Sequence, residues 1–156
     1  MTARVPDETD LDLRKQVCFA LYAASRALTA LYRPVLDRLG LTYPQYLVML
    51  VLWERGDTSV KALGTSLELD SGTLSPLLKR LEAAGLVTRA RDPRDERSVL
   101  ISLTAAGDAL RTQAAGIPRA IAEATGVPAD KLADLRDTLR MITQAAHSAA
   151  EDKETT

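Results

Sequence analysis

The 156-residue sequence predicts a mainly α-helical fold with one small β-hairpin. Leu and Ala dominate the apolar residues and aromatic residues make up only 4%, a composition that favours helices over sheets. Strand-like alternation is concentrated in one stretch, where residues 87–91 and 98–103 flank the charged, turn-forming hexapeptide Asp92–Arg97. Two helical patterns separated by a short break come directly before this hairpin. A helix-turn-helix followed by an arginine-tipped hairpin is the pattern of a winged helix-turn-helix, which binds duplex DNA.

The N-terminal part of the chain predicts two helices. Apolar residues recur at helical spacing from about Asp12, and we expect Pro34 to kink or restart this first helix. Gly40 is expected to end it. Thr42 and Gln45 then have the spacing of a capping box, which opens a second helix that stops before residue 56.

A third and a fourth helix make up the expected helix-turn-helix. The third is short and covers residues 60–67. The fourth has four leucines on one face, which we expect to be buried: Leu74, Leu77, Leu78 and Leu81. Pro76 lacks an N–H group, so we expect the ordered helix to begin later than the leucine pattern suggests.

The last two helical regions begin at Thr104 and Pro128, and the first of them is interrupted near residues 116–118. Like the first helix, they are apolar on more than one side. Such helices either cover the winged domain or pack against a second copy of the chain. We favour the second copy, with residues 1–42 and 104–156 as a helical dimerisation region and residues 43–103 as the winged helix-turn-helix domain.

Composition excludes several classes of protein. No apolar run approaches the roughly 18 residues of a membrane span, and the first residues do not form a signal peptide, so we expect a cytoplasmic protein without membrane contact. The single cysteine, Cys18, excludes an intrachain disulfide and a CxxC metal site, and we expect no metal and no cofactor. The net charge of −1 hides a local excess, since residues 79–97 carry six basic side chains against four acidic ones.

The fourth helix and the hairpin carry the residues that we expect to bind DNA. Small hydroxyl side chains early in the helix suit base edges and phosphates in the major groove, and later cations suit the DNA backbone. The predicted contacts are Ser71, Thr73, Ser75, Lys79, Arg80, Arg91 and Arg94. The alternative is an ordinary solvated hairpin on a helical protein.

Two arginines of the hairpin receive different roles. Arg94 at the tip has the length and planar charge that suit a narrow minor groove. Arg97 lies two residues from Asp95, and we expect this pair to brace the wing rather than to contact DNA.

Five segments of the sequence together resemble the MarR family of bacterial regulators, from about Val17 to Ile142. They are Leu41–Tyr46, Leu69–Leu74, Leu78–Glu82, Gly85–Val87 and Asp92–Thr104. The chain resembles one branch of this family, the organic hydroperoxide-sensing OhrR repressors, in two features: the segment Glu96-Arg97-Ser98-Val99 and a cysteine in the first helix. The resemblance implies a homodimer that binds a pseudo-palindromic operator, releases it when an organic hydroperoxide oxidises Cys18, and so derepresses a peroxide-detoxifying gene.

Cys18 has the surroundings of a reactive thiol. It lies early in the first helix, where the helix dipole favours a thiolate, with Arg14 one turn before it and Tyr22 one turn after it. Tyr32 and Tyr43 occupy the positions at which OhrR proteins place their reactive-site tyrosines. The resemblance implies that these two tyrosines reach the cysteine from the other subunit.

Oxidation would convert the thiol to a sulfenic acid, which condenses with another thiol. The sequence holds no second cysteine, so a small cellular thiol, a backbone sulfenamide or overoxidation must complete the switch.

Two other functions are compatible with parts of the sequence. A thiol peroxidase could use Cys18, but no P-x-x-x-T-x-x-C pattern and no resolving cysteine are present, and we expect no enzyme. A MarR-type repressor could instead be released by a small aromatic ligand, with Cys18 purely structural. Oxidant-dependent release from DNA separates this last alternative from the peroxide sensor.

Overall fold

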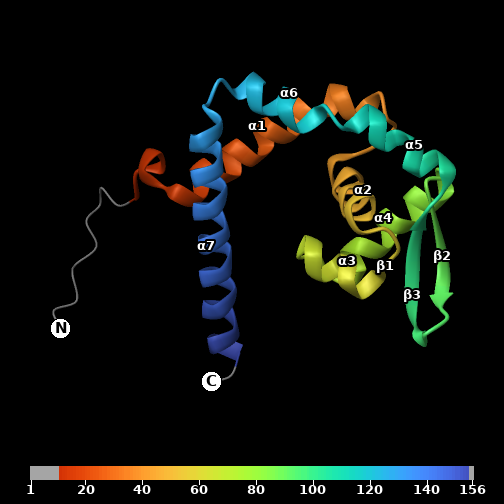
Figure 1. Cartoon of the computed structure of the whole chain (residues 1–156). Helices are drawn as coiled ribbons and strands as arrows, with labels where there is room; N and C mark the ends of the chain where they lie inside the picture. Colours follow the sequence, from red (N-terminus) through yellow and green to blue (C-terminus); the bar gives the residue numbers. More distant parts are fainter. Residues whose placement is uncertain (1–10, 155–156) are drawn as a thin grey trace. The chain divides into compact units, whose positions relative to one another are not determined.

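Helices make up most of residues 11–154, the part of the chain that the computed structural model describes. The first of two units, residues 1–115, contains a 3₁₀ turn, five α-helices and a small sheet within its described part (Figure 1). In chain order these are η2 (Leu13–Lys15), α1 (Val17–Asp37), α2 (Tyr43–Arg55), β1 (Thr58–Ser59), α3 (Val60–Leu67), α4 (Ser71–Ala83), β2 (Val87–Asp92), β3 (Asp95–Leu103) and α5 (Ala105–Ala114). The expected fold class, helical with a β-hairpin wing, is confirmed.

The sheet is antiparallel and has the strand order β1-β3-β2. In the hairpin Val87 pairs with Leu103 and Arg91 with Val99, and the regular register breaks between Arg91 and Asp92. The sequence did not predict β1, whose Thr58 pairs with Ile101. A two-residue strand is too short to show alternation, but it ties the start of α3 to the wing.

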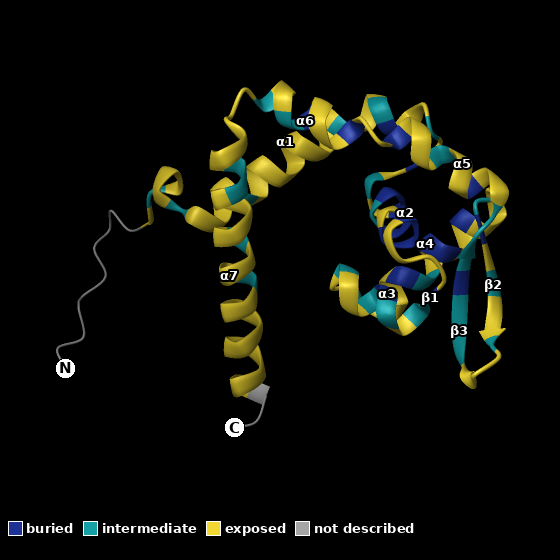
Figure 2. Cartoon of the chain, viewed as in Figure 1, coloured by how far each residue is buried: buried dark blue, intermediate teal, exposed yellow. Residues whose placement is uncertain are grey.

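The core of this unit is formed by α2, α3 and α4 against one face of the sheet (Figure 2). The four leucines of α4 are buried, as predicted, and so are Tyr46, Met49, Leu52, Leu63, Val87 and Ile101. Removing such side chains from water drives folding and fixes the outward face of α4.

Local capping determines where α2 and α4 begin. The Thr42 hydroxyl accepts the Gln45 N–H, and the Gln45 side chain accepts the Thr42 N–H at 2.9 Å, so the predicted capping box is present. The Asp70 carboxylate caps α4 by accepting the Thr73 N–H, and Ala84 with the left-handed Gly85 ends that helix.

Three expectations about helix bounds were wrong. The first helix begins at Val17 and not near Asp12, because Asp12 caps the separate turn η2 and Gln16 is extended. Pro34 lies inside an uninterrupted α1, and Pro76 lies inside an α4 that starts at Ser71. Each proline removes one backbone hydrogen bond, but buried side chains close by in the same helices hold the flanking turns in place.

The second unit contains α6 (Ile117–Thr125) and α7 (Ala129–Glu154). The Pro128 carbonyl accepts the Leu132 N–H, which confirms Pro128 as the residue that opens the last helix. From Ala129 to Lys153 no side chain of α7 is buried, although Leu135, Met141 and Ile142 are apolar. The division into a dimerisation region and a winged domain remains a prediction, and residues 1–10 and 155–156 of that region lie outside the described residues. Within the described range, no helix is long and apolar enough to cross a membrane.

Candidate functional site

The outward face of α4 presents small polar groups first and cations later. Ser71 and Thr73 are exposed and Ser75 is half-buried, while Lys79 and Arg80 are exposed one to two turns further on. In the described part of the chain neither cation forms an ion pair, and neither serine hydroxyl has a hydrogen-bond partner. These groups are therefore available to a ligand.

Thr73 differs from the two serines because Asp70 holds it. The Asp70 carboxylate accepts the Thr73 backbone N–H at 2.7 Å and the Thr73 hydroxyl at 3.3 Å. The hydrogen bond from the Thr73 backbone, followed by that from its side chain, lowers the pKa of Asp70. Asp70 therefore stays ionised and accepts both hydrogen bonds, which leaves the Thr73 oxygen facing outward as an acceptor.

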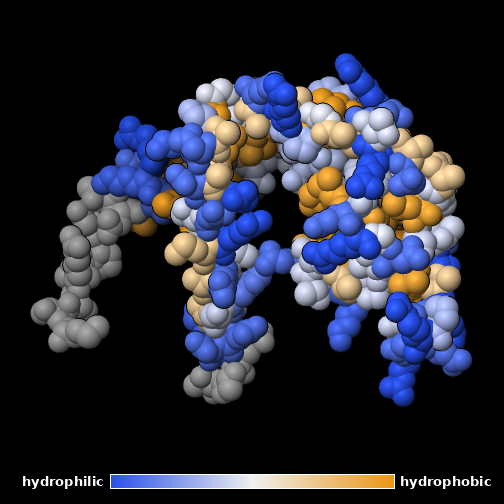
Figure 3. Space-filling model, in the orientation of Figure 1, coloured by the Kyte–Doolittle hydropathy of each residue, from blue (hydrophilic) through white to orange (hydrophobic). Residues whose placement is uncertain are grey.

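The wing is the β2–β3 hairpin, and hydrophilic side chains gather at its end (Figure 3). Arg91 is exposed on β2. The Arg94 side chain is 86% exposed at the tip, and its Nε lies 3.5 Å from Oδ1 of Asp92, which also accepts the Arg94 backbone N–H at 2.9 Å. Sequence reasoning missed Asp92, although an Asp two residues before an Arg at a turn is a recognisable Asx-turn signal. The ion pair is exposed and weak, so it orients Arg94 without preventing it from reaching DNA.

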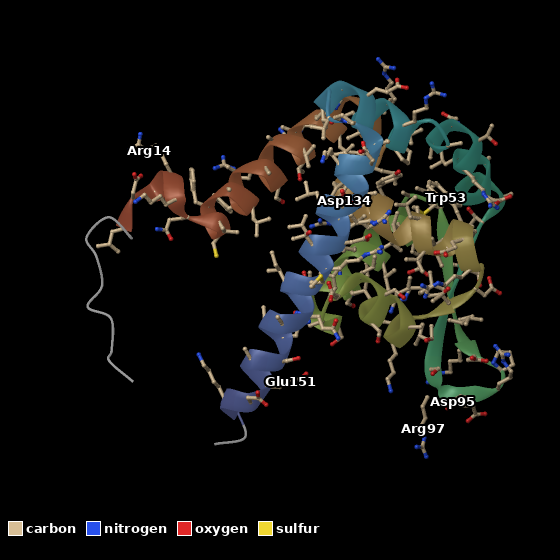
Figure 4. The ribbon with its side chains drawn as sticks, turned by 60° about the vertical axis from the view of Figure 1, so that its left-hand side comes forward. Arg14, Trp53, Asp95, Arg97, Asp134 and Glu151 are labelled. Atoms are coloured by element: carbon tan, nitrogen blue, oxygen red, sulfur yellow. The ribbon has the colours of Figure 1, made fainter. Side chains whose placement is uncertain are left out.

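Asp95 and Arg97 do not pair through their charges. The Asp95 carboxylate accepts the Arg97 backbone N–H at 3.1 Å and lies 3.5 Å from the Ser98 hydroxyl. The Arg97 guanidinium has no ion-pair partner in the described chain and extends away from the end of the hairpin (Figure 4). Asp95 thus holds the strand backbone, and the Arg97 side chain is free to meet a phosphate.

Cys18 is the second residue of α1 and is exposed in the single chain. This position puts its sulfur near the N-terminal end of the helix dipole. The expected help from Arg14 is absent, because the guanidinium donates to both Asp12 carboxylate oxygens, at 3.2 and 3.0 Å, and its side chain is 89% exposed. The hydrogen bonds from Arg14 also lower the pKa of Asp12.

Tyr22 is likewise turned away from a sulfur contact. Its ring is 60% exposed, and the Arg26 guanidinium lies 5.5 Å from the ring centroid. No hydrogen bond joins its hydroxyl to Cys18 within one chain.

Tyr32 and Tyr43 come together between α1 and α2, with ring centroids 4.8 Å apart. Both rings are half-buried, and neither hydroxyl has a partner among residues 11–154. Burial raises the pKa of both phenols, and the nearby Tyr43 adds to the rise at Tyr32. Both hydroxyls are therefore neutral donors at physiological pH.

One chain cannot bring these two donors to its own cysteine. Tyr32 follows Cys18 by fourteen residues on the same helix, a separation of about 21 Å at 1.5 Å per residue. Tyr43 packs against Tyr32 and is equally remote. The thiol and the tyrosine pair therefore lie apart within one chain, the thiol near the start of α1 and the pair where α1 meets α2.

Sequence reasoning also missed Tyr46, a buried ring beside Tyr32 and Tyr43 with centroid distances of 5.8 and 6.2 Å. Its helical spacing is that of any core residue, so no sequence signal distinguished it. No group of three or more His, Cys, Asp or Glu side chains suited to a metal ion occurs in the described range.

Comparisons with known proteins agree with this geometry. The family model for the transcriptional regulator SarA/Rot matches residues 30–112. The organic hydroperoxide resistance transcriptional regulator of Bacillus subtilis (strain 168) is 47% identical over 137 residues, which cover 88% of this chain and 93% of that protein. The HTH-type transcriptional regulator TtmR of Methylorubrum extorquens (strain PA1) is 49% identical over 138 residues, 88% of this chain and 71% of that protein.

Solved structures of AbfR, a protein of Staphylococcus epidermidis, are also similar. Reduced AbfR bound to DNA has a TM-score of 0.71 and 32% identity, and the match covers 90% of this chain and 96% of that one. Overoxidised AbfR bound to DNA has a TM-score of 0.73, and the disulfide form of AbfR has 0.59.

The winged fold, the polar face of α4 and these similarities define a DNA-binding transcriptional regulator and not an enzyme. Within that class the chain belongs to the MarR family, and it is a regulator of the OhrR type.

Proposed function

We propose that this regulator is a dimeric repressor that senses organic hydroperoxides by oxidation of Cys18 and then releases its operator. The observation that carries the proposal is the separation of the exposed thiol near the start of α1 from two free tyrosine hydroxyls, that of Tyr32 further along α1 and that of Tyr43 at the start of α2. The identity of 47% to an organic hydroperoxide resistance transcriptional regulator supports organic hydroperoxides as the signal.

DNA binding rests on α4 and the wing. Ser71, Thr73 and Ser75 would enter the major groove, Lys79 and Arg80 would hold phosphates, and Arg94 would enter the flanking minor groove. With Arg91 they would form the DNA-binding surface, and a dimer would place two such surfaces about one helical turn of DNA apart. AbfR, which has the same fold, was solved on DNA.

The dimer is supported by apolar side chains that one chain leaves in water. On α1, Val17, Phe19 and Leu28 are 63%, 43% and 40% exposed. A second copy packed on α1 would bury apolar surface of these side chains. It would also bring its Tyr32 and Tyr43 hydroxyls to Cys18. Each sensing site would then combine the thiol of one subunit with the tyrosine pair of the other.

In the completed site the tyrosine hydroxyls donate to the sulfur and favour its thiolate form. The thiolate attacks the terminal oxygen of the hydroperoxide, the O–O bond breaks, and the products are a sulfenic acid and an alcohol. The apolar side chains nearby favour an organic hydroperoxide over hydrogen peroxide.

A small cellular thiol then completes the switch. Its sulfur attacks the sulfenic sulfur, a mixed disulfide forms and water leaves. Overoxidation is a less suitable signal, because AbfR was solved on DNA in its overoxidised form as well as in its reduced form. With one cysteine in the chain, an intrachain disulfide is excluded.

The test measures operator binding by the wild type and by Cys18→Ser, each with and without cumene hydroperoxide and a small thiol. Serine nearly matches cysteine in size but is not deprotonated at neutral pH and does not follow the sulfur oxidation series. Both proteins should bind the operator equally before peroxide is added, and the peroxide should release only the wild type. Release of Cys18→Ser by the peroxide would contradict the proposal and favour a repressor controlled by a small aromatic ligand.

A further inference from the structure

Tyr46 is a buried titratable residue to which neither DNA binding nor thiol chemistry assigns a role. It is 1% exposed, and its hydroxyl is the one buried side-chain polar atom without a hydrogen-bond partner in the described part of the chain. Burial, together with Tyr32 and Tyr43 nearby, raises its pKa to about 12. An unpartnered buried hydroxyl destabilises the state that contains it, so any rearrangement that gives it a partner is favoured.

Tyr46 lies between the tyrosine pair and the core of the winged domain. Its ring contacts Tyr32 and Tyr43 on one side, and it meets the Trp53 ring edge-on at a centroid distance of 6.4 Å on the other. Tyr46 and Trp53 are both on α2, two turns apart. A movement of either sensing tyrosine therefore displaces a ring that also packs on Trp53.

Trp53 connects this cluster to the start of the wing. It is buried, and its Nε1 donates to the Gly107 carbonyl at 3.0 Å (Figure 4). Gly107 in turn packs so closely on the Leu86 carbonyl that no Cβ fits between them. The Leu86 carbonyl also accepts the Thr104 N–H at 3.1 Å, and Leu86 directly precedes β2.

We propose that Tyr46 is a positioning residue of the sensor, which passes movements of Tyr32 and Tyr43 through Trp53 and Gly107 to the start of the wing. The inference rests on the proposed function, because it requires that oxidation of Cys18 moves the tyrosine pair. In the reduced protein Tyr46 holds the two rings in place with its hydroxyl unpaired. When the pair moves, the Tyr46 hydroxyl gains a partner and the shift at Trp53 reaches the β2 end of the hairpin.

Trp53 is the chain's single tryptophan, so its fluorescence reports on this path directly. Titration of the wild type with cumene hydroperoxide should change its emission in proportion to the oxidised fraction of Cys18, measured by intact-protein mass spectrometry. Cys18→Ser should show no change. An emission that stays constant while Cys18 is oxidised and the operator is released would overturn the path through Trp53.

The decisive comparison uses Tyr46→Phe and Tyr43→Phe, which make the same chemical change one turn apart. Tyr46→Phe removes only an unpartnered hydroxyl, so the reduced protein should bind the operator normally and melt at a higher temperature. Its Cys18 should be oxidised at the wild-type rate, but operator release per oxidised cysteine should fall about fivefold or more, the lower end of usual coupling between sites. Tyr43→Phe should show the reverse, with slow oxidation and normal release per oxidised cysteine.

Trp53→Phe supplies a second test, because it keeps a ring and removes the N–H donor to Gly107. It should also uncouple release from oxidation. If Tyr46→Phe and Trp53→Phe both release the operator normally per oxidised cysteine, Tyr46 is an ordinary core residue and the inference fails. If wild-type Cys18 is oxidised without any release, the proposed function fails instead.

Discussion

Gly107→Ala should destabilise the protein, although alanine is the better helix former. Gly107 is buried in the first turn of α5, where its N–H donates to the Thr104 hydroxyl at 3.0 Å and its carbonyl accepts the Trp53 indole N–H. A Cβ built on Gly107 collides with the Leu86 carbonyl oxygen and lies 3.0 Å from its carbon, and both are backbone atoms. The clash therefore cannot be relieved by a side-chain rotation.

The expected size of the effect follows from one stabilising and two destabilising contributions to the free energy of unfolding. Replacing a helical glycine by alanine stabilises by about 1 kcal/mol. Overpacking of a filled core costs about 1–3 kcal/mol, and a shift of α5 that relieved it would weaken the buried bond to Trp53, worth about 1 kcal/mol. The net prediction is a loss of about 2 kcal/mol in the free energy of unfolding.

Urea unfolding, followed by circular dichroism at one fixed protein concentration, measures this loss. Gly116→Ala is the matched control, because nothing lies within 4 Å of its added Cβ and its φ of −85° suits any residue. The control should change stability by less than about 1 kcal/mol. Equal stability of Gly107→Ala and the wild type would refute the close contact between α5 and the residue before β2.

Two further predictions concern DNA. Arg94→Ala should lower the magnitude of the slope of log affinity against log salt by about two, since a dimer loses one cation from each wing. Arg26→Ala on α1 is the control. An unchanged slope for Arg94→Ala would contradict the wing contact. Thr73→Val should erase a preference for adenine or cytosine at one position of each half-site, because the acceptor that Asp70 leaves facing outward suits base amino groups. Selection from a randomised duplex library measures this preference, with Ser75→Ala as the comparison, and an unaltered preference in Thr73→Val would show that this oxygen reads no base.

Local signals in the sequence predicted the helix-turn-helix and the hairpin, although they missed β1 and misplaced the start of α4. The Thr42–Gln45 box and the four leucines of α4 each act within one or two turns, and the structure has them as expected. The start of α1 was misplaced because Leu13 and Val17 keep a helical spacing across a 3₁₀ turn and an extended Gln16. Periodicity of apolar residues does not reveal such a break.

Tertiary contacts explain the remaining differences. Pro34 and Pro76 are poor helix residues by local rules, but packing of the surrounding turns outweighs the lost backbone bonds. Arg14 lies one turn before Cys18 in the sequence and could have assisted the thiol, but an aspartate two residues away binds it instead. The role proposed for Tyr46 depends on its buried hydroxyl having no hydrogen-bond partner in the described part of the chain. No pattern in the sequence reveals this.

Completion of the peroxide-sensing site by a second copy of the chain is the central element of the proposed mechanism. Heterodimers isolated with two affinity tags test it, if one subunit carries Cys18→Ser and the other carries both Tyr32→Phe and Tyr43→Phe. In a site built across the dimer, the one remaining cysteine faces the intact tyrosines of its partner.

Stopped-flow oxidation of that cysteine by cumene hydroperoxide should then proceed at the wild-type rate. The homodimer with both phenylalanine substitutions should be about tenfold or more slower, as expected from losing hydrogen bonds to a charged acceptor. A heterodimer as slow as that homodimer would contradict the claim, because the cysteine would then depend on the tyrosines of its own chain.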